Sequence, residues 1–301
     1  MPELPDVTVY RERLVALLGG RELDGVRLFS PFVLRSVEPP VQALVGRTLQ
    51  DVERLGKRLV LVFGDDLFLV LHLMIAGRLR LRKPGAKPPG KMGLAAFDFA
   101  ASTLMLTEAA SKKRASLHVV HGRAGLAEFD RGGLEVMDTD VEAFAAALRR
   151  ENRTLKRALT DPRILSGIGN AYSDEILHAA RLSPTQLTAN LGDDAMARLF
   201  AATRDTLRTW TERLRTEVGD GFPDEVTAFR EAMAVHGRYK QPCPVCQTPV
   251  QHILYASNEC NYCPTCQTEG RLLADRGLSQ LMRKDWPKTL EELEEKKGRP
   301  P

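Results

Sequence analysis

The sequence predicts an α+β protein with a β-rich part first and a helical part after it. Three observations predict this class. The chain has 301 residues, which is about twice a common domain length. Short apolar or alternating runs fill its first third, whereas apolar residues recur at helical spacing from about residue 138. A cysteine-rich segment from about residue 236 to 268 follows the helical part.

The first third predicts one helix followed by many short strands. Apolar residues fall at helical spacing over about residues 7–18. Six apolar or alternating runs follow, separated by turn residues, at 58–63, 67–71, 78–82, 94–99, 103–107 and 116–120. Many short strands at close spacing are typical of a β-sandwich or a β-barrel, and the runs alone do not choose between the two.

The second part predicts a series of amphipathic helices. Helix-forming residues with apolar faces occupy residues 141–148, 155–159, 171–180 and 195–214. The helical pattern ends at the glycine- and proline-containing residues 219–223, and a further helical stretch is expected at 224–235. An amphipathic stretch at 271–282 and a charged end at 291–298, which we expect to be frayed, complete the chain.

The composition favours a protein of a reducing compartment with a mild preference for anionic partners. The formal net charge is +4. No run approaches the roughly 20 apolar residues that a membrane span needs, so no membrane partner is expected. The acidic, proline-bearing start is unlike a signal peptide, and a cytoplasmic location is therefore expected.

Two cysteine pairs predict a zinc site. Each pair has the pattern Cys-Pro-x-Cys, and sixteen residues separate Cys243 and Cys246 from Cys263 and Cys266. A tight turn within each pair directs both thiolates at one tetrahedral ion, and zinc suits four sulfur ligands. Cys260 also forms a CxxC with Cys263, but the matching prolines favour the first choice. Because a closed four-sulfur site leaves no open coordination position, the expected Zn²⁺ is structural.

Five short motifs then point to a known family. They lie at residues 2–7, 56–58, 72–78, 165–175 and 235–243, the last leading into the first cysteine pair. In this order they resemble the motifs of the formamidopyrimidine-DNA glycosylase and endonuclease VIII family. The resemblance extends over residues 1 to about 268, and the chain is identified as a divergent member.

The resemblance implies an architecture and an activity. It implies an N-terminal β-sandwich catalytic domain with a helix at 1–132, a helix–two-turns–helix domain at 138–234, a zinc-ribbon hairpin at 235–268 and a charged helical tail at 269–301. It also implies a monomeric DNA glycosylase with AP lyase activity, acting on double-stranded DNA that contains damaged bases or abasic sites. Such an enzyme flips the damaged base out of the stack before acting on it.

The resemblance also implies roles for five catalytic residues. After removal of Met1, the nitrogen of Pro2 attacks the sugar C1′, and Glu3 acts as the acid and base beside it. Lys57 contacts a phosphate or protonates the departing group. Asp6 replaces the more usual glutamate of the family, and Glu175 helps to organise the site.

A further set of residues is expected to contact DNA. Backbone N–H groups at the glycine-containing turn, together with the first residue of the next helix, are expected to bind a phosphate. Met74 or Ile75 is expected to enter the base stack as a wedge. The alternatives are an ordinary interhelical turn and, for residues 112–114, a solvated charged loop. The expected DNA-binding residues are Gly167, Gly169, Asn170, His72, Met74, Ile75, Lys112, Lys113, Arg114 and Lys156.

Three departures from the family pattern bear on the substrate. Asn258 stands where the family's hairpin carries an arginine, and an amide cannot neutralise a phosphate. Residues 222–235 are short where the 8-oxoguanine enzymes carry a long glycine-rich loop, and residues 108–115 lack the family's aromatic wedge. Oxidised pyrimidines, formamidopyrimidines and abasic sites are the expected substrates. A damage-binding protein that has lost turnover is the competing interpretation.

Overall fold

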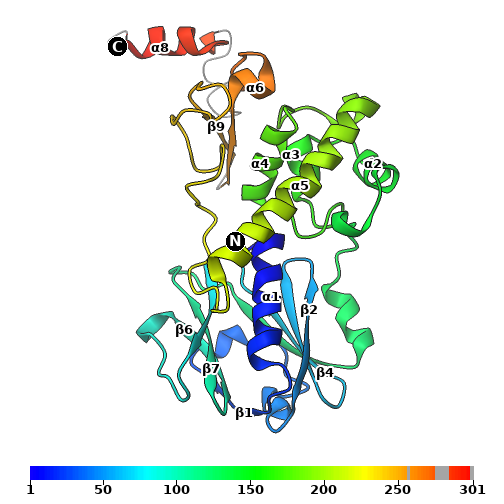
Figure 1. The fold of residues 1–301 in the computed structure, drawn as a ribbon, viewed down its shortest axis with the longest axis vertical. Coiled ribbons are helices and arrows are strands. Elements are labelled where there is room, and N and C mark those ends of the chain that lie inside the picture. Colours follow the sequence, from blue (N-terminus) through cyan, green and yellow to red (C-terminus); the bar gives the residue numbers. More distant parts are fainter. Residues whose placement is uncertain (256–257, 275–284, 299–301) are drawn as a thin grey trace. The chain divides into compact units, whose positions relative to one another are not determined.

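The structure is a computed structural model that describes residues 1–255, 258–274 and 285–298. Its contacts divide the chain into two compact units (Figure 1). The first unit comprises Met1–Gly132 and Arg208–Ala228, and the second comprises Gly133–Leu207 and Phe229–Pro301. The α+β class is confirmed, and the finer division into four domains stays a prediction. Among the described residues, no helix is both long and apolar enough to span a bilayer.

The first unit is a β-sandwich with one helix, so the sandwich is confirmed over the barrel. Two antiparallel four-stranded sheets have the strand orders β1-β6-β7-β5 and β2-β3-β4-β8. Helix α1 (Leu4–Leu18, dark blue in Figure 1) packs against β2. The strands are β1 (Leu23–Leu28), β2 (Leu49–Leu55), β3 (Arg58–Phe63), β4 (Leu67–His72), β5 (Gly77–Arg82), β6 (Gly93–Phe99), β7 (Ser102–Glu108) and β8 (Ser116–His121).

The core of this unit follows from the alternation of side chains along each strand. Alternate residues of β3, such as Leu59 and Leu61, point into one continuous apolar cluster. Leu104 and Leu106 of β7 enter the same cluster from the other sheet, and Tyr10 enters it from α1. The cluster therefore fixes the start of α1 against the sandwich.

The second unit contains helices and a small hairpin. Within the described residues, six short 3-10 helices connect elements of the two units: η1 (Pro31–Val33), η2 (Val41–Leu44), η3 (Gly90–Met92), η4 (Arg123–Phe129), η5 (Val136–Asp138) and η6 (Thr188–Asn190). The longest helix, α5, begins in the second unit and ends in the first. The remaining elements are α2 (Val141–Arg149), α3 (Leu155–Thr160), α4 (Asn170–Ala179), α5 (Asp193–Val218), β9 (Gln251–Tyr255), β10 (Asn258–Tyr262), α6 (Pro264–Thr268) and α8 (Leu290–Gly298).

The expected helix at 224–235 is wrong, because this segment has no regular structure. Its first part is fixed to β5 by side chains instead. Arg82 pairs with the Asp224 carboxylate at 2.5 Å, and the Arg78 guanidinium donates to the Val226 carbonyl. The Val226 side chain is buried in the sandwich core. A helix would need that carbonyl for its own ladder, so tertiary contacts override local propensity here.

The carboxyl-terminal expectations have mixed outcomes. The charged end, which we expected to be frayed, is helix α8, with acidic residues in its first turn where the helix dipole favours them. Most of the amphipathic stretch expected at 271–282 lies outside the described residues.

Candidate functional site

The first residues of the chain are held in place by the start of α1. Pro2, Glu3 and Asp6 are all buried. Glu3 is the N-cap residue, and its backbone N–H donates to Asp6 Oδ2 at 2.9 Å in a reciprocal capping box. Pro5 occupies the first turn, where its missing N–H leaves no intrahelical bond unmade. The chain start therefore has a defined position on the sandwich.

Charged groups of both signs surround the amino group at the chain start. Burial lowers the pKa of the Met1 amino group, and the carboxylates of Glu3 and Asp6 oppose that shift. Arg78 and Lys57 lower the pKa further through their positive charges. The structure thus brings three of the predicted catalytic residues, Glu3, Asp6 and Lys57, into electrostatic range of one amine.

Lys57 reaches this place from a turn and Arg78 from the start of β5. Lys57 follows Gly56, which has φ of 61° in the tight turn between β2 and β3. The Arg78 guanidinium donates to the carbonyls of Gly77 at 2.7 Å and Ile75 at 3.1 Å. Arg78 is the last residue of the motif at 72–78, but the sequence predicted no role for it. Only the fold shows that it lies beside the amine.

The loop after β4 holds three predicted DNA-binding residues. His72 ends β4, and burial together with Arg58 and Lys57 lowers its pKa to about 4, so its ring is neutral at neutral pH. Met74 adopts φ of 54° within the turn that the Gly77 N–H closes onto the Leu73 carbonyl. Ile75 is 58% exposed, as a wedge residue at a loop tip must be.

A buried carboxylate organises the basic loop after β7. Glu108 Oε2 accepts the backbone N–H groups of Arg114 at 2.8 Å and Ala115 at 3.1 Å. The Lys113 ammonium donates a hydrogen bond to the Glu108 carbonyl, whereas Lys112 is exposed. Of the three cations predicted to bind DNA, Lys113 therefore makes a hydrogen bond within the loop, whereas the side chains of Lys112 and Arg114 are exposed.

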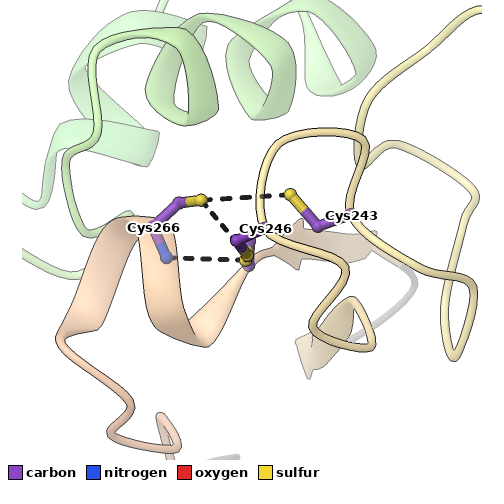
Figure 2. Close-up of side chains that lie close together, drawn as sticks. Cys243, Cys246 and Cys266 are labelled. Atoms are coloured by element: carbon purple, nitrogen blue, oxygen red, sulfur yellow. Dashed lines mark hydrogen bonds between the residues drawn. The ribbon is translucent and has the colours of Figure 1, made fainter.

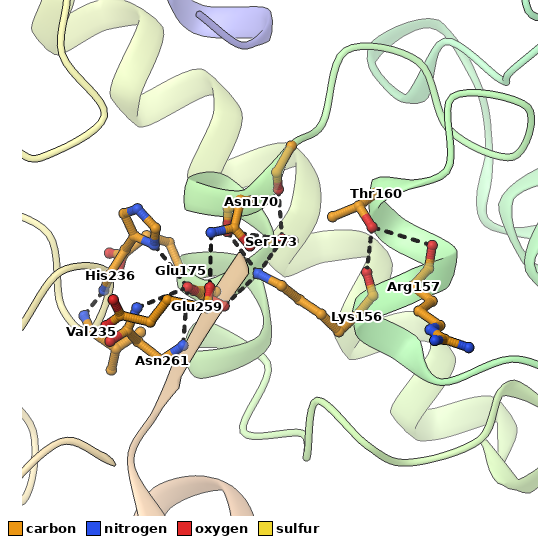
Figure 3. A network of polar contacts seen from close by, with 12 residues as sticks. Lys156, Arg157, Thr160, Asn170, Ser173, Glu175, Val235, His236, Glu259 and Asn261 are labelled. Carbon is orange, nitrogen blue, oxygen red and sulfur yellow. Dashed lines mark hydrogen bonds and ion pairs between the residues drawn. The ribbon is translucent and has the colours of Figure 1, made fainter. Parts of the chain in front are cut away.

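The turn before α4 has the geometry expected of a glycine-containing connection. Gly167 adopts φ of 81°, and Gly169 is the N-cap of α4. Asn170, the first helical residue, donates its side-chain amide to the Glu259 carbonyl of β10 at 2.8 Å (Figure 3). One N–H of this amide thus holds the hairpin, and the contact of Asn170 with a phosphate stays a prediction.

Lys156 has partners inside the second unit. Its ammonium donates to the Asn170 carbonyl at 2.7 Å and to Ser173 Oγ at 2.8 Å (Figure 3). It also donates to Asp174 Oδ1 at 2.5 Å. These bonds use all three ammonium donors. A contact of Lys156 with DNA, which stays a prediction, would have to replace one of them.

Asp174 is the centre of a buried ionic network that sequence reasoning missed. Burial alone would raise its pKa, but Lys156 and His236 lower it. His236 Nδ1 lies 2.8 Å from Asp174 Oδ2, and the Asn261 backbone N–H donates to the same oxygen at 3.1 Å. The carboxylate therefore joins α3, α4 and the hairpin.

Glu175 accepts three backbone N–H groups from the segment before the hairpin. The donors are Ala234 at 2.7 Å, Val235 at 2.9 Å and His236 at 2.9 Å. Burial raises the pKa of Glu175 and these donors oppose the shift. This geometry describes a carboxylate that fixes a backbone segment, in keeping with the organising role expected for it.

The four predicted zinc ligands lie together. Their sulfur atoms are all within 4.8 Å of one another. The Cys243–Cys266 and Cys246–Cys266 sulfur pairs are separated by 3.9 and 3.5 Å (Figure 2). The Cys246 and Cys263 sulfur atoms are 3.3 Å apart. A tetrahedral ion with Zn–S bonds of about 2.3 Å requires sulfur separations of about 3.8 Å. The four thiolates therefore fit a closed tetrahedral zinc site.

Cys260 is outside this cluster, as the matching prolines predicted. It lies on β10, where burial and the neighbouring Asp174 carboxylate raise the pKa of its thiol. A protonated thiol is a poor metal ligand, since the thiolate is the binding form. Asn258 pairs with Tyr255 across the hairpin, and its side chain lies outside the described part of the structure.

Family models match both units. A model of the formamidopyrimidine-DNA glycosylase N-terminal domain matches residues 1–115, and a model of the H2TH domain of these enzymes matches residues 134–218. A formamidopyrimidine-DNA glycosylase of Pelotomaculum thermopropionicum is 32% identical over 276 residues, which cover 89% of this chain and 99% of the relative. The chain belongs to the formamidopyrimidine-DNA glycosylase family.

Solved structures of the formamidopyrimidine-DNA glycosylase family share the fold. The Lactococcus lactis Fpg complex with DNA containing an oxidised pyrimidine is 26% identical, with a TM-score of 0.78, over 89% of this chain and 100% of that chain. The same enzyme bound to DNA containing an abasic site is 25% identical, with a TM-score of 0.76, over 88% and 99% of the two chains. The family resemblance of the five motifs is thereby confirmed.

Proposed function

We propose that this member of the formamidopyrimidine-DNA glycosylase family is a bifunctional DNA glycosylase and AP lyase. One observation carries the proposal: the Met1 amino group at the chain start lies within electrostatic range of Glu3, Asp6, Lys57 and Arg78. A nucleophilic amine needs a depressed pKa and a neighbouring proton carrier, and we propose that the same groups supply both to the Pro2 nitrogen once Met1 is removed. The family membership and the DNA complexes of the relatives support the same function.

The proposed reaction begins after removal of Met1. The free nitrogen of Pro2 forms a bond to C1′ while the glycosidic bond breaks and the base departs with a proton. The C1′–O4′ bond of this adduct then breaks as Glu3 protonates the ring oxygen, and because Pro2 is a secondary amine, the ring-opened product is a cationic iminium. Loss of a proton from C2′ then breaks the C3′–O bond, and the 3′ phosphate leaves by β-elimination. Water finally releases the sugar from the enzyme.

The surrounding side chains have distinct proposed roles. Glu3 carries protons to the ribose ring oxygen and away from it, since it is the residue directly after the nucleophile. Asp6 holds the Glu3 backbone through the capping box and so positions both residues. Lys57 and Arg78, whose positive charges lower the pKa of the Met1 amino group, are proposed to act in the same direction on the Pro2 nitrogen, and Lys57 is also proposed to contact a phosphate.

We propose that the four-cysteine cluster holds one structural Zn²⁺ and that the partner is damaged double-stranded DNA. The sulfur separations support the ion. Zinc supplies no chemistry to the reaction here, because a four-sulfur site is closed, and instead holds the hairpin together. Oxidised pyrimidines and abasic sites are the proposed substrates, by analogy with the DNA in the Lactococcus lactis complexes.

Borohydride trapping on abasic-site DNA tests the proposal. Reduction of the iminium gives a stable covalent adduct that is visible as a shifted band on a denaturing gel. We expect the processed protein to form the adduct, Pro2→Gly to form far less, and a lesion-free duplex of the same sequence to form none. A protein that retards abasic DNA on a native gel but traps nothing would instead be a damage-binding protein without turnover.

A further inference from the structure

Helix α4 presents one polar face to the cysteine-rich segment. Asn170, Asp174 and His178 are spaced four residues apart, so their side chains lie on the same side of the helix. Asn170 bonds the Glu259 carbonyl and Asp174 bonds the Asn261 N–H. His178 makes the third contact of this face, and of the three it is the one that reaches a predicted metal ligand.

The contact of His178 is with the thiol sulfur of Cys243. His178 Nε2 lies 3.3 Å from Cys243 Sγ, and the two residues are 6% and 0% exposed. The Val245 backbone N–H lies 3.5 Å from the same sulfur. Burial leaves little access for water to supply a donor in place of the ring. A thiolate bound to an ion still accepts hydrogen bonds, and such bonds orient it and tune its donor strength.

We infer that His178 is a positioning residue of the metal centre, donating Nε2–H to the Cys243 thiolate and so linking the ion to α4. The inference rests on the proposal that the cysteine cluster holds zinc. It assigns the hydrogen bond a specific donor position, the ring nitrogen that is distant from the backbone. The same bond joins the last turn of α4 to the cysteine-rich segment, whereas Asn170 joins the first turn of the helix to β10.

Three substitutions separate the donor from the shape of the ring. The amide nitrogen of glutamine in His178→Gln reaches the position of the imidazole Nε2, whereas that of His178→Asn is one methylene too short. His178→Phe keeps a ring of similar shape without any donor. Gln and Asn are equally polar, so a difference between them reports the position of the donor and not burial.

The measurement is the transfer of zinc from the full-length protein to a chromophoric chelator. We expect His178→Asn and His178→Phe to bind zinc about 10–100-fold more weakly than the wild type, as removal of such hydrogen bonds does elsewhere. His178→Gln should stay close to the wild type. Should the phenylalanine variant fail to fold, the Gln and Asn pair still decides the question.

Cobalt substitution gives a second readout that packing alone does not change. The thiolate-to-cobalt charge-transfer bands should shift in His178→Asn and His178→Phe and stay in place in His178→Gln. Equal zinc affinity and equal spectra in all variants would overturn the role of His178 while leaving the zinc proposal intact. A glutamine variant as weak as the asparagine variant would also overturn it. A wild type that holds no zinc would overturn both.

Discussion

Two adjacent buried carboxylates of α4, those of Asp174 and Glu175, have different hydrogen-bond partners. Asp174 faces a lysine ammonium and a histidine, whereas Glu175, the next residue, faces only backbone N–H donors within the contacts described above. Neighbouring residues on a helix point about 100° apart, so adjacent carboxylates meet different surroundings. The family motif pointed to Glu175 but not to Asp174. Nothing in the sequence around an aspartate indicates that a lysine and a buried histidine from other segments will contact it.

Substitution of Glu175 tests its structural role. Glu175→Gln replaces one carboxylate oxygen by an NH₂ group, so at least one of the three N–H groups of residues 234–236 loses its acceptor. We expect a loss of roughly 1–3 kcal/mol in the free energy of unfolding, the cost of leaving buried donors unpaired. Urea unfolding measures this loss, with the exposed Glu212→Gln as the matched control. Equal stability of the two variants would contradict the role.

The neutral ring of His72 predicts a pH dependence of stability. Its pKa is about 4 in the fold against 6.5 in an unfolded chain. Between these values the unfolded chain binds the extra proton, so the free energy of unfolding falls as pH falls from 6.5 toward 4. The contribution is up to about 3 kcal/mol. From pH 6.5 to pH 4, the free energy of unfolding should therefore fall further in the wild type than in His72→Gln, by up to this amount. Parallel pH profiles of the two proteins would argue against a depressed pKa of His72.

The capping box at the chain start predicts a stability effect linked to the site. Asp6→Ala removes the acceptor of the Glu3 N–H and should lower the free energy of unfolding by about 1 kcal/mol. Because the same bond positions the residues beside the amine, covalent trapping on abasic DNA should fall too. Asp6→Asn keeps an acceptor oxygen and should retain most of the stability. Indistinguishable unfolding midpoints for Asp6→Ala and the wild type would contradict this account.

At the scale of elements, the sequence predicts the strands and helices whose apolar residues alternate or recur at helical spacing. Six strands and five helices have the expected type and nearly the expected bounds. The two strands that were not predicted, β1 and β2, are sheet edges whose charged residues interrupt the apolar alternation. The wrong helix at 224–235 has the opposite cause, since arginines of a distant strand fix a segment that local propensity describes as helical. Long-range contacts of this kind leave no local signal.

Metal removal tests the hairpin as an element. In the proposed zinc site, removal of the ion unlinks the four cysteines, whereas α2 to α5 keep buried apolar side chains such as Phe144, Leu159 and Leu199. We therefore expect a strong chelator to increase hydrogen exchange across β9, β10 and α6 with little loss of helical circular dichroism. Restored protection on adding zinc is the control. A chelated protein whose hairpin stays protected would show that the metal is dispensable for this element.

At the scale of the whole molecule, the chain forms two compact units, and each contains buried apolar side chains. The sandwich unit contains the amine and its charged neighbours, and the helical unit contains the glycine turn and the cysteine cluster. The motifs predicted these groups because each needs a particular residue type at a particular spacing. They did not predict Arg78 beside the amine or His178 beside Cys243, because these contacts depend on how separate segments pack.

The most direct test of the central claim is to locate the covalent bond. The borohydride-reduced adduct with abasic DNA is digested by nuclease and protease, and the modified peptide is sequenced by mass spectrometry. The account predicts a sugar remnant on the nitrogen of Pro2 in a chain that has lost Met1. A remnant on Lys57, or on a chain that retains Met1, would contradict it.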